Sequence, residues 1–125
     1  MIFLDTHVVA WLYAGRIERF PRAALEFLEG GQISISPMAG LELQYLYEIQ
    51  RLTEPGFTVI ADLEKRIGLT VADVSLAEIT ALAHDVSWTR DPFDRLIVAQ
   101  AMFHEARLLT ADRIILENYE HACWD

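Results

Sequence analysis

The chain has 125 residues, 53% of them hydrophobic, which fits one globular domain with its own core. Ten Lys and Arg residues against 19 Asp and Glu residues give a formal net charge of -9, so a nucleic-acid-binding role would need a divalent metal ion or local arginines to offset the acids. The single cysteine, Cys123, excludes an internal disulfide framework and a thiolate metal cluster, and it suits a reducing cytoplasm.

The apolar start MIFLDTHVVAWLYAG is not typical of a signal peptide, because it has no basic leading residues and Asp5 and His7 interrupt it. No segment approaches the length of a transmembrane helix. We therefore expect a soluble, unprocessed cytoplasmic protein with no membrane association. The negative net charge also suits a basic protein partner.

The first third of the chain alternates between strand and helix signals. Met1–Asp5 is an apolar run of β-forming residues and predicts a buried strand. Thr6 can then cap a helix over His7–Tyr13, with Gly15 just beyond its end. The next expected elements are a helix over Pro21–Leu28 and a strand over Gln32–Ser36.

The middle of the chain predicts a helical hairpin. Ser36 followed by Pro37 is an N-cap with proline at the first helical position, which indicates a helix over Pro37–Leu52. A second helix is expected over Phe57–Ile67, after a turn. Apolar residues at helical spacing predict the buried face of the first helix: Met38, Leu41, Tyr45, Ile49 and Leu52.

The last part repeats the alternation, and Asp91–Pro92 repeats the N-cap and proline signal. The expected elements are a strand over Leu69–Val74, a helix over Leu76–His84 capped by Ser75, a loop over Trp88–Asp91, a helix over Pro92–Glu105, a strand over Arg107–Thr110, a short helix over Asp112–Glu117 and a candidate fifth strand over His121–Trp124. Alternating strands and helices require right-handed crossovers. We therefore predict a three-layer α/β/α domain with a central, mainly parallel sheet of four to five strands.

Four acidic residues fall where the strands of such a sheet end. Asp5 ends the first strand, Asp112 follows the strand over Arg107–Thr110, and Asp94 and Glu42 lie near the starts of their helices. In open parallel sheets, ligands bind beyond the carboxyl ends of the strands. The four acids are therefore expected to gather at one edge of the sheet.

Glu42 is the most informative of the four. Tyr45, Leu46 and Ile49 share its helical row, and an unpaired carboxylate on an apolar face is costly to bury. A metal ion would satisfy this charge, and so would an arginine at the edge of the apolar stripe.

Each remaining acid also has a purely structural interpretation. Asp5 and Asp112 can cap the helices that follow them, and capping fully explains Asp91. Asp94 favours the positive end of its helix. Only the convergence of the four acids at one sheet edge favours a site.

Clustered carboxylates without a matching basic cluster need a counter-ion. Oxygen ligands without cysteine, and without paired histidines, select Mg²⁺ or Mn²⁺ over zinc, and such a site usually serves phosphodiester hydrolysis. Thr6 and Thr110 could position a water or a carboxylate, although both also suit caps or strand ends. Arg90 and Arg95 flank the acids and are candidates for phosphate contacts, with surface salt bridges as the alternative.

Four segments resemble the motif regions of PIN domains, in the same order: LDTHVVAWL, SPMAGLEL, RDPFDRLIVAQA and LLTAD. The resemblance is greatest to VapC-like toxins that carry a DPFDR motif, and it covers nearly the whole chain. It implies a single PIN-like domain over residues 1–125 with Mg²⁺-dependent ribonuclease activity. It also implies that Asp5, Glu42, Asp94 and Asp112 hold the catalytic metal, with Asp91 as an outer acid.

The same resemblance implies binding partners, and the chain departs from the family pattern at one segment. VapC-like toxins form homodimers, cleave RNA and bind a cognate antitoxin whose tail covers the active-site groove. The end of the chain, NYEHACWD, is only a faint version of the last strand of the family. The topology of the C-terminal segment is therefore left open.

Three alternatives remain. A phosphatase of the haloacid-dehalogenase type would use Asp5 as a nucleophile, but it needs a second aspartate at the position held by His7. A non-catalytic protein-binding domain would keep the fold and lose the acids, all four of which are present. A PIN nuclease acting in RNA processing outside any toxin–antitoxin pair would carry the same site.

Overall fold

Five short parallel strands form the centre of the computed structural model, which describes residues 1–125. They are β1 (Ile2–Leu4), β2 (Ile33–Ile35), β3 (Thr70–Val71), β4 (Arg107–Leu109) and β5 (Ala122–Cys123). The sheet order is β3-β2-β1-β4-β5, and every neighbouring pair is parallel. The predicted α/β fold is confirmed, and the candidate fifth strand exists as β5.

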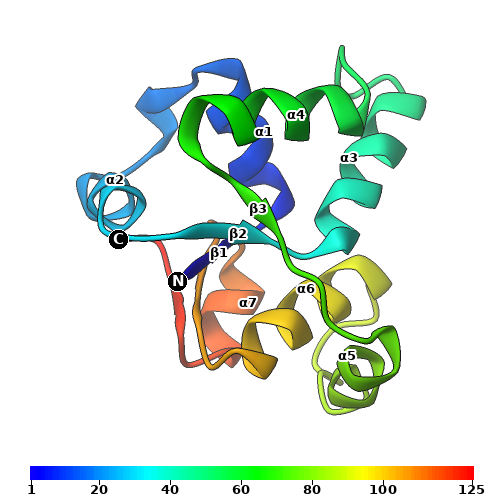
Figure 1. Ribbon diagram of the computed structural model, residues 1–125. Coiled ribbons are helices and arrows are strands. Elements are labelled where there is room, and N and C mark those ends of the chain that lie inside the picture. Colours follow the sequence, from blue (N-terminus) through cyan, green and yellow to red (C-terminus); the bar gives the residue numbers. More distant parts are fainter.

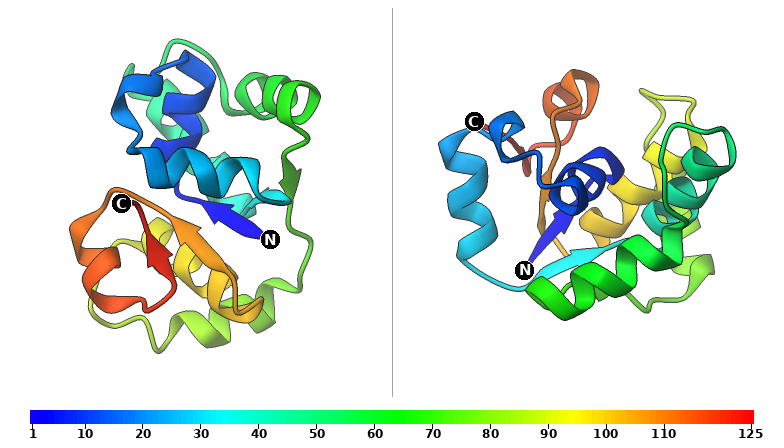
Figure 2. Two further views of the ribbon diagram at one scale, coloured as in Figure 1. Left: turned by 90° about the vertical axis from the view of Figure 1, so that its left-hand side faces the viewer. Right: turned by 90° about the horizontal axis from the view of Figure 1, so that it is seen from above.

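Seven α-helices and one 3-10 helix surround the sheet. They are α1 (Thr6–Ala14), η1 (Ile17–Arg19), α2 (Arg22–Glu29), α3 (Pro37–Glu48), α4 (Gly56–Ile67), α5 (Leu76–Ala83), α6 (Pro92–Phe103) and α7 (Arg113–Asn118). Helices α1 and α4 lie on one side of the sheet and α5, α6 and α7 on the other, a division visible in Figures 1 and 2. None of these helices combines the length and the apolarity that crossing a bilayer requires.

The middle strands carry the core because both of their faces are covered. All three residues of β1 are buried, and so are Leu108 and Leu109 of the adjacent strand β4. Such fully apolar strands are typical of a parallel sheet with helices on both faces. The chain leaves β1 toward β2 on one side and returns to β4 on the other, so the order reverses between β1 and β4. This reversal is where open α/β sheets place their ligand sites.

Two details of the expected helices were wrong. Helix α1 begins one residue early, at Thr6, because the side chain of Asp5 accepts a hydrogen bond from the Thr6 backbone N–H; Asp5, not Thr6, is the N-cap. Helix α3 ends at Glu48 rather than Leu52. The predicted strand over Leu69–Val74 is likewise reduced to the two residues of β3.

The predicted buried face of α3 was also wrong. Leu41, Tyr45 and Ile49 are exposed, while Met38 and Leu52 are only partly buried. The face that packs inward instead carries Ala39, Leu43 and Leu46. Apolar residues surround this helix, so their spacing alone could not show which face is buried. The small residue Gly40 lies where α4 approaches most closely, and this contact orients the helix.

The α3–α4 hairpin yields a stability prediction. A Cβ atom at Gly56 would lie 2.8 Å from the Gly40 carbonyl oxygen and 3.1 Å from the Gln44 backbone nitrogen. Both are backbone atoms, so α4 would have to move away from α3. We expect Gly56→Ala to lower the free energy of unfolding by about 1–3 kcal/mol, measured by urea denaturation.

Gly31→Ala is the matched control, because a Cβ atom there would meet nothing within 4 Å. This control should leave the free energy of unfolding within about 0.5 kcal/mol of the wild type. Equal effects at the two glycines would contradict the close approach of the two helices.

Candidate active site

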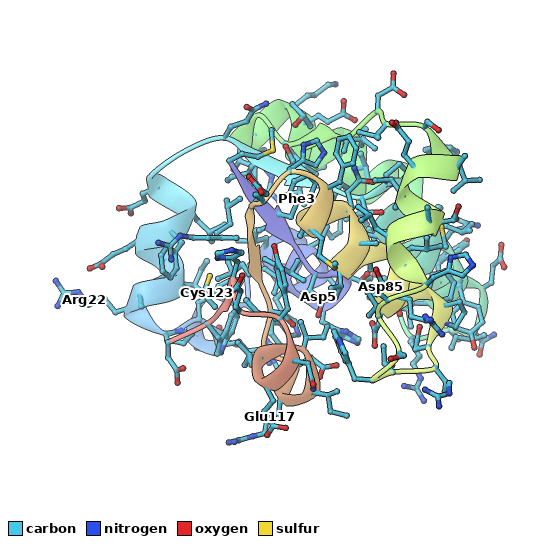
Figure 3. The ribbon with its side chains drawn as sticks, turned by 90° about the horizontal axis from the view of Figure 1, so that it is seen from below. Phe3, Asp5, Arg22, Asp85, Glu117 and Cys123 are labelled. Carbon is cyan, nitrogen blue, oxygen red and sulfur yellow. The ribbon has the colours of Figure 1, made fainter.

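The Thr110 hydroxyl joins the ends of the two central strands. Its Oγ1 donates to Oδ2 of Asp5 at 2.6 Å and accepts from the backbone N–H of Asp112 at 3.0 Å. The other carboxylate oxygen of Asp5 accepts from the Thr6 N–H at 2.8 Å. Asp5 and Thr110 are both buried. The structure therefore fixes the Asp5 carboxylate at the end of β1, where Figure 3 shows it with β4 on one side and α6 on the other.

Asp112 and Asp91 are the N-caps of two helices. Asp112 caps α7 through Oδ1, which accepts from the N–H groups of Ile114 and Ile115. Asp91 caps α6 through its own Oδ1 in the same way. In both residues the second carboxylate oxygen has no partner within the protein. The predicted caps are confirmed, and each leaves one oxygen available to a ligand.

Glu42 is half-buried on α3 and has no arginine partner, so the alternative of a salt bridge is absent from the structure. Burial raises the pKa of its carboxyl group, while the nearby Thr6 hydroxyl and His7 lower it. Thr6 Oγ1 is the only fully buried side-chain N or O atom without a hydrogen-bond partner. The Thr6 hydroxyl thus forms no hydrogen bond of ordinary geometry, yet it is close enough to Glu42 to lower the pKa of that carboxyl group.

Asp94 lies in the first turn of α6, half-buried and without an ion pair or a hydrogen bond to its carboxylate. Burial raises its pKa to about 7, and repulsion from four other carboxylates contributes. In decreasing order of effect these are Asp5, Asp91, Glu42 and Asp112. This repulsion places Asp94 near the other four acids. The strand ends predicted that Asp5, Glu42, Asp94 and Asp112 gather, and Asp91 is an addition to that group.

No arginine neutralises the five acids. The Arg95 guanidinium donates to the carbonyl oxygens of Ala83 at 3.0 Å and His84 at 3.2 Å, at the end of α5. The Arg90 guanidinium donates to the carbonyl oxygen of Ser87. Neither residue forms the surface salt bridge considered as an alternative. Their use as phosphate contacts stays a prediction.

His7 was not predicted as part of the site. It is exposed on the first turn of α1, and its charge when protonated lowers the pKa of both Asp5 and Glu42. Burial remains the largest effect on Asp5, and the net shift of its pKa is upward. The only signal in the sequence was position: His7 follows the strand-end motif LDT by one residue.

The donor set fits a hard divalent cation that retains water. All candidate ligands are carboxylate oxygens, and three of them have raised pKa values that a positive charge would reverse. No group of three or more acidic, histidine or cysteine side chains is already arranged tightly enough to hold an ion directly. Mg²⁺ usually keeps several waters and binds through one or two carboxylates, so this looser arrangement suits it.

Comparison with known proteins assigns the fold and the family together. The family model described as the PIN domain matches residues 2–121. Ribonuclease VapC22 from Mycobacterium tuberculosis is 32% identical over 115 residues, covering 90% of this chain and 87% of the relative.

Three solved structures share the fold. VapBC2 from Rickettsia felis, bound to a DNA fragment from its promoter, has a TM-score of 0.71 at 19% identity and covers 100% of both chains. A toxin–antitoxin complex from Klebsiella pneumoniae has a TM-score of 0.68 at 17% identity, covering 98% of this chain and 96% of the other. VapBC-1 from nontypeable Haemophilus influenzae has a TM-score of 0.67 at 18% identity, covering 100% and 97%. At these identities the structural likeness supports the fold alone.

The raised pKa of Asp94 predicts a pH-dependent cost of folding without metal. The unfolded chain holds this proton only below about pH 4, whereas the folded protein holds it up to about pH 7. The folded state therefore loses stability as pH rises from about 4 to 7. Asp94→Asn removes this loss, so without metal it should match the wild type near pH 4. At pH 8 it should be more stable by about 1–2 kcal/mol, a value reduced for solvent screening.

Thermal unfolding in EDTA across this pH range measures the difference. Asp85→Asn is the control, because Asp85 is an exposed aspartate outside the cluster. A stability difference between Asp94→Asn and wild type that does not change with pH would contradict the crowding of the acids.

Proposed function

The chain belongs to the PIN-domain family, and on that premise we propose that it is a metal-dependent endoribonuclease acting as the toxin of a VapBC-type toxin–antitoxin pair. The observation that carries the proposal is the convergence of acids at one sheet edge: Thr110 bonds the Asp5 carboxylate to the Asp112 backbone, and Asp94 lies half-buried and unpaired in the first turn of α6. Carboxylates gathered in this way destabilise the folded protein unless a cation is bound. Such a cluster is expected where a divalent metal ion completes a phosphodiester-cleaving site.

In this proposal Asp5, Glu42, Asp94 and Asp112 hold Mg²⁺ or Mn²⁺. When bound, the ion would lower the pKa of a water and stabilise the leaving oxygen of the phosphodiester. Asp91, which caps α6 through one oxygen, is assigned an outer position, as the resemblance to VapC-like toxins implies. All further roles fall to groups of the protein itself.

Thr110 positions two of the acids and does not itself react. Its hydroxyl donates to the Asp5 carboxylate and accepts from the Asp112 N–H, and these two bonds set the separation of the acids. Thr6 is different, because its buried Oγ1 has no partner. We assign the Thr6 hydroxyl to orient the Glu42 carboxylate or a water beside it.

Substrate contacts fall to the few cations near the site. Arg90 uses only part of its guanidinium on Ser87, and Arg95 uses Nε and Nη2 on the end of α5. Their remaining N–H groups could contact a phosphate of the RNA. Arg95 also ties the C-terminal end of α5 to the first turn of α6, which carries Asp94.

The proposed partners follow from the family and the charge. VapBC complexes pair a toxin with an antitoxin, and we propose a cognate antitoxin for this chain, together with a homodimer. A net charge of -9 favours a basic antitoxin segment. RNA as substrate and a single cysteine both favour the cytoplasm. We further assign the chain to the branch of VapC-like toxins with a DPFDR motif, which stands at residues 91–95.

Removal of one acid should separate catalysis from folding. We expect Asp94→Asn to lower Mg²⁺-dependent cleavage of RNA at least about 100-fold while the protein stays folded, because the change removes a metal-ligand charge at nearly constant shape. EDTA should abolish cleavage by the wild type. Cleavage is measured on a labelled RNA by gel electrophoresis, with folding checked by circular dichroism.

Asp85→Asn serves as the control and should cleave RNA like the wild type. Undiminished cleavage in excess EDTA would overturn the metal-dependent mechanism. Normal cleavage by folded Asp94→Asn would remove Asp94 from the site.

The proposed homodimer and the proposed antitoxin complex can both be detected by their mass in solution. Light scattering of the purified chain should give the mass of two chains, and addition of the neighbouring gene product should give a larger complex. Because attraction to a basic segment is screened by ions, this complex should weaken as salt is raised from about 0.05 to 0.5 M. A monomer at high concentration, with and without that product, would argue against both partners.

A further inference from the structure

A pocket of about 190 Å³ is lined in part by the two residues that flank Asp112 in the chain. It is lined by Ala111, Arg113, Leu116, Glu117, Trp124 and Asp125. Ala111 and Arg113 are the chain neighbours of Asp112, so the pocket lies next to this part of the backbone, and Asp112 itself does not line it. The backbone N–H of Thr110 donates to the Cys123 carbonyl at 3.1 Å, which brings Trp124 to the same edge of the sheet as the acids.

The Trp124 ring is held in place by other aromatic side chains. Its centroid lies 5.3 Å from that of Phe20 and 5.8 Å from that of Trp11. Trp11 is itself covered by the Arg19 guanidinium, 5.2 Å from its centroid. Trp124 is thus partly buried by packing and yet also lines the pocket. A ring fixed in this way offers a preorganised surface for another planar group.

The charged groups of the pocket have no partners within the protein. Arg113, Glu117 and Asp125 form neither ion pairs nor side-chain hydrogen bonds. Most other basic side chains near α1 and α2 are engaged, such as Arg16 with Glu18 and Arg22 with Glu26. The pocket therefore combines one free cation, two free carboxylates and an aromatic ring.

We propose that this pocket, here called the Trp124 pocket, binds one nucleobase of the RNA next to the phosphate that is cleaved; the proposal rests on the proposed ribonuclease function. A cavity of about 150 Å³ accommodates benzene, so the volume suits a base-sized ring. The Trp124 ring stacks on the base, and Arg113 contacts an adjoining phosphate. Glu117 and Asp125 accept hydrogen bonds from an exocyclic amino group. Adenine, cytosine and guanine carry such a group, and uracil does not.

Cleavage-site mapping on a randomised RNA pool with Mg²⁺ tests this proposal. The wild type should disfavour uracil at one fixed position next to the cut. Trp124→Ala should lose this preference and lower kcat/KM on a preferred RNA about tenfold or more, the scale of one lost base stack. Trp124→Phe, which keeps a ring, should retain most of both. Trp88→Ala, a tryptophan outside the pocket, should keep the base preference.

A fluorescence experiment keeps the test decisive if Trp124→Ala does not fold. In a Trp11→Phe, Trp88→Phe protein that also carries Asp94→Asn, Trp124 is the only tryptophan and the RNA is not cleaved. Cytidine-containing oligonucleotides should quench its emission more strongly than uridine-containing ones at high Mg²⁺. Arg113→Gln in the same background should weaken the apparent affinity several-fold.

Failure of this inference differs from failure of the function. If no RNA is cleaved under any metal condition, the proposed ribonuclease is wrong. If RNA is cleaved but Trp124→Ala and Arg113→Gln leave base preference and kcat/KM unchanged, the Trp124 pocket is not a base site. Loss of binding to the neighbouring gene product alone, with RNA cleavage intact, would assign the pocket to a protein partner and overturn the proposal.

Discussion

The hydrogen bonds of one threonine set the geometry on which the acidic site depends. Thr110 lies at the end of β4 and bonds both to the Asp5 carboxylate, at the end of β1, and to the Asp112 backbone. β1 and β4 are neighbours at the point where the chain changes direction across the sheet. The two strands therefore cannot shift relative to each other without breaking these bonds. The apolar core buries the strands, and the threonine holds the two acids that emerge from them.

The remaining acids reach the same edge because helices begin there. Asp91 and Asp112 each accept hydrogen bonds from a helix N-terminus through one oxygen, which orients the carboxylate and leaves its second oxygen free. Capping and ligand binding are therefore compatible uses of one side chain. Asp94 has no such anchor, and its position depends on where α6 begins. The Asp91–Pro92 start and the bonds from Arg95 to the end of α5 both fix that first turn.

Much of this arrangement could be predicted from the sequence, because strand ends and helix starts have strong local signals. The end of an apolar run gave the correct position of Asp5 in the fold. The N-cap followed by proline did so for Asp94, and the short strand before it did so for Asp112. Glu42 was placed on a half-buried helix for a sound reason, although part of the argument was wrong. Tyr45 on its row is exposed rather than buried. The inward face of α3 depends on its contact with α4 at Gly40 and Gly56, and periodicity cannot show such a contact between separate segments.

The positions of His7, near the acids, and of Trp124, in the proposed base pocket, were not predicted for a related reason. Neither belongs to a spacing pattern, and their nearness to the acids comes from the direction of α1 and from the pairing of β5 with β4. The faint final strand matters here, because two backbone-paired residues are enough to bring Trp124 to the edge of the sheet at which β4 ends. A weak local signal can thus determine which residues share a surface when the tertiary structure supplies the rest.

The net charge of -9 is less of an obstacle to RNA binding than composition alone suggests. Part of the negative charge lies in the site itself, where a divalent ion would offset it. Several basic side chains already contact other groups of the protein, including Arg107 over the Phe27 ring and Arg66 in an ion pair with Asp62. Arg113 is left beside Asp112 with no partner. Attraction to a phosphate depends on charges within a few ångströms far more than on the sum over the molecule. The proposed RNA binding therefore requires only a local positive charge, which Arg113 and a bound metal ion would supply.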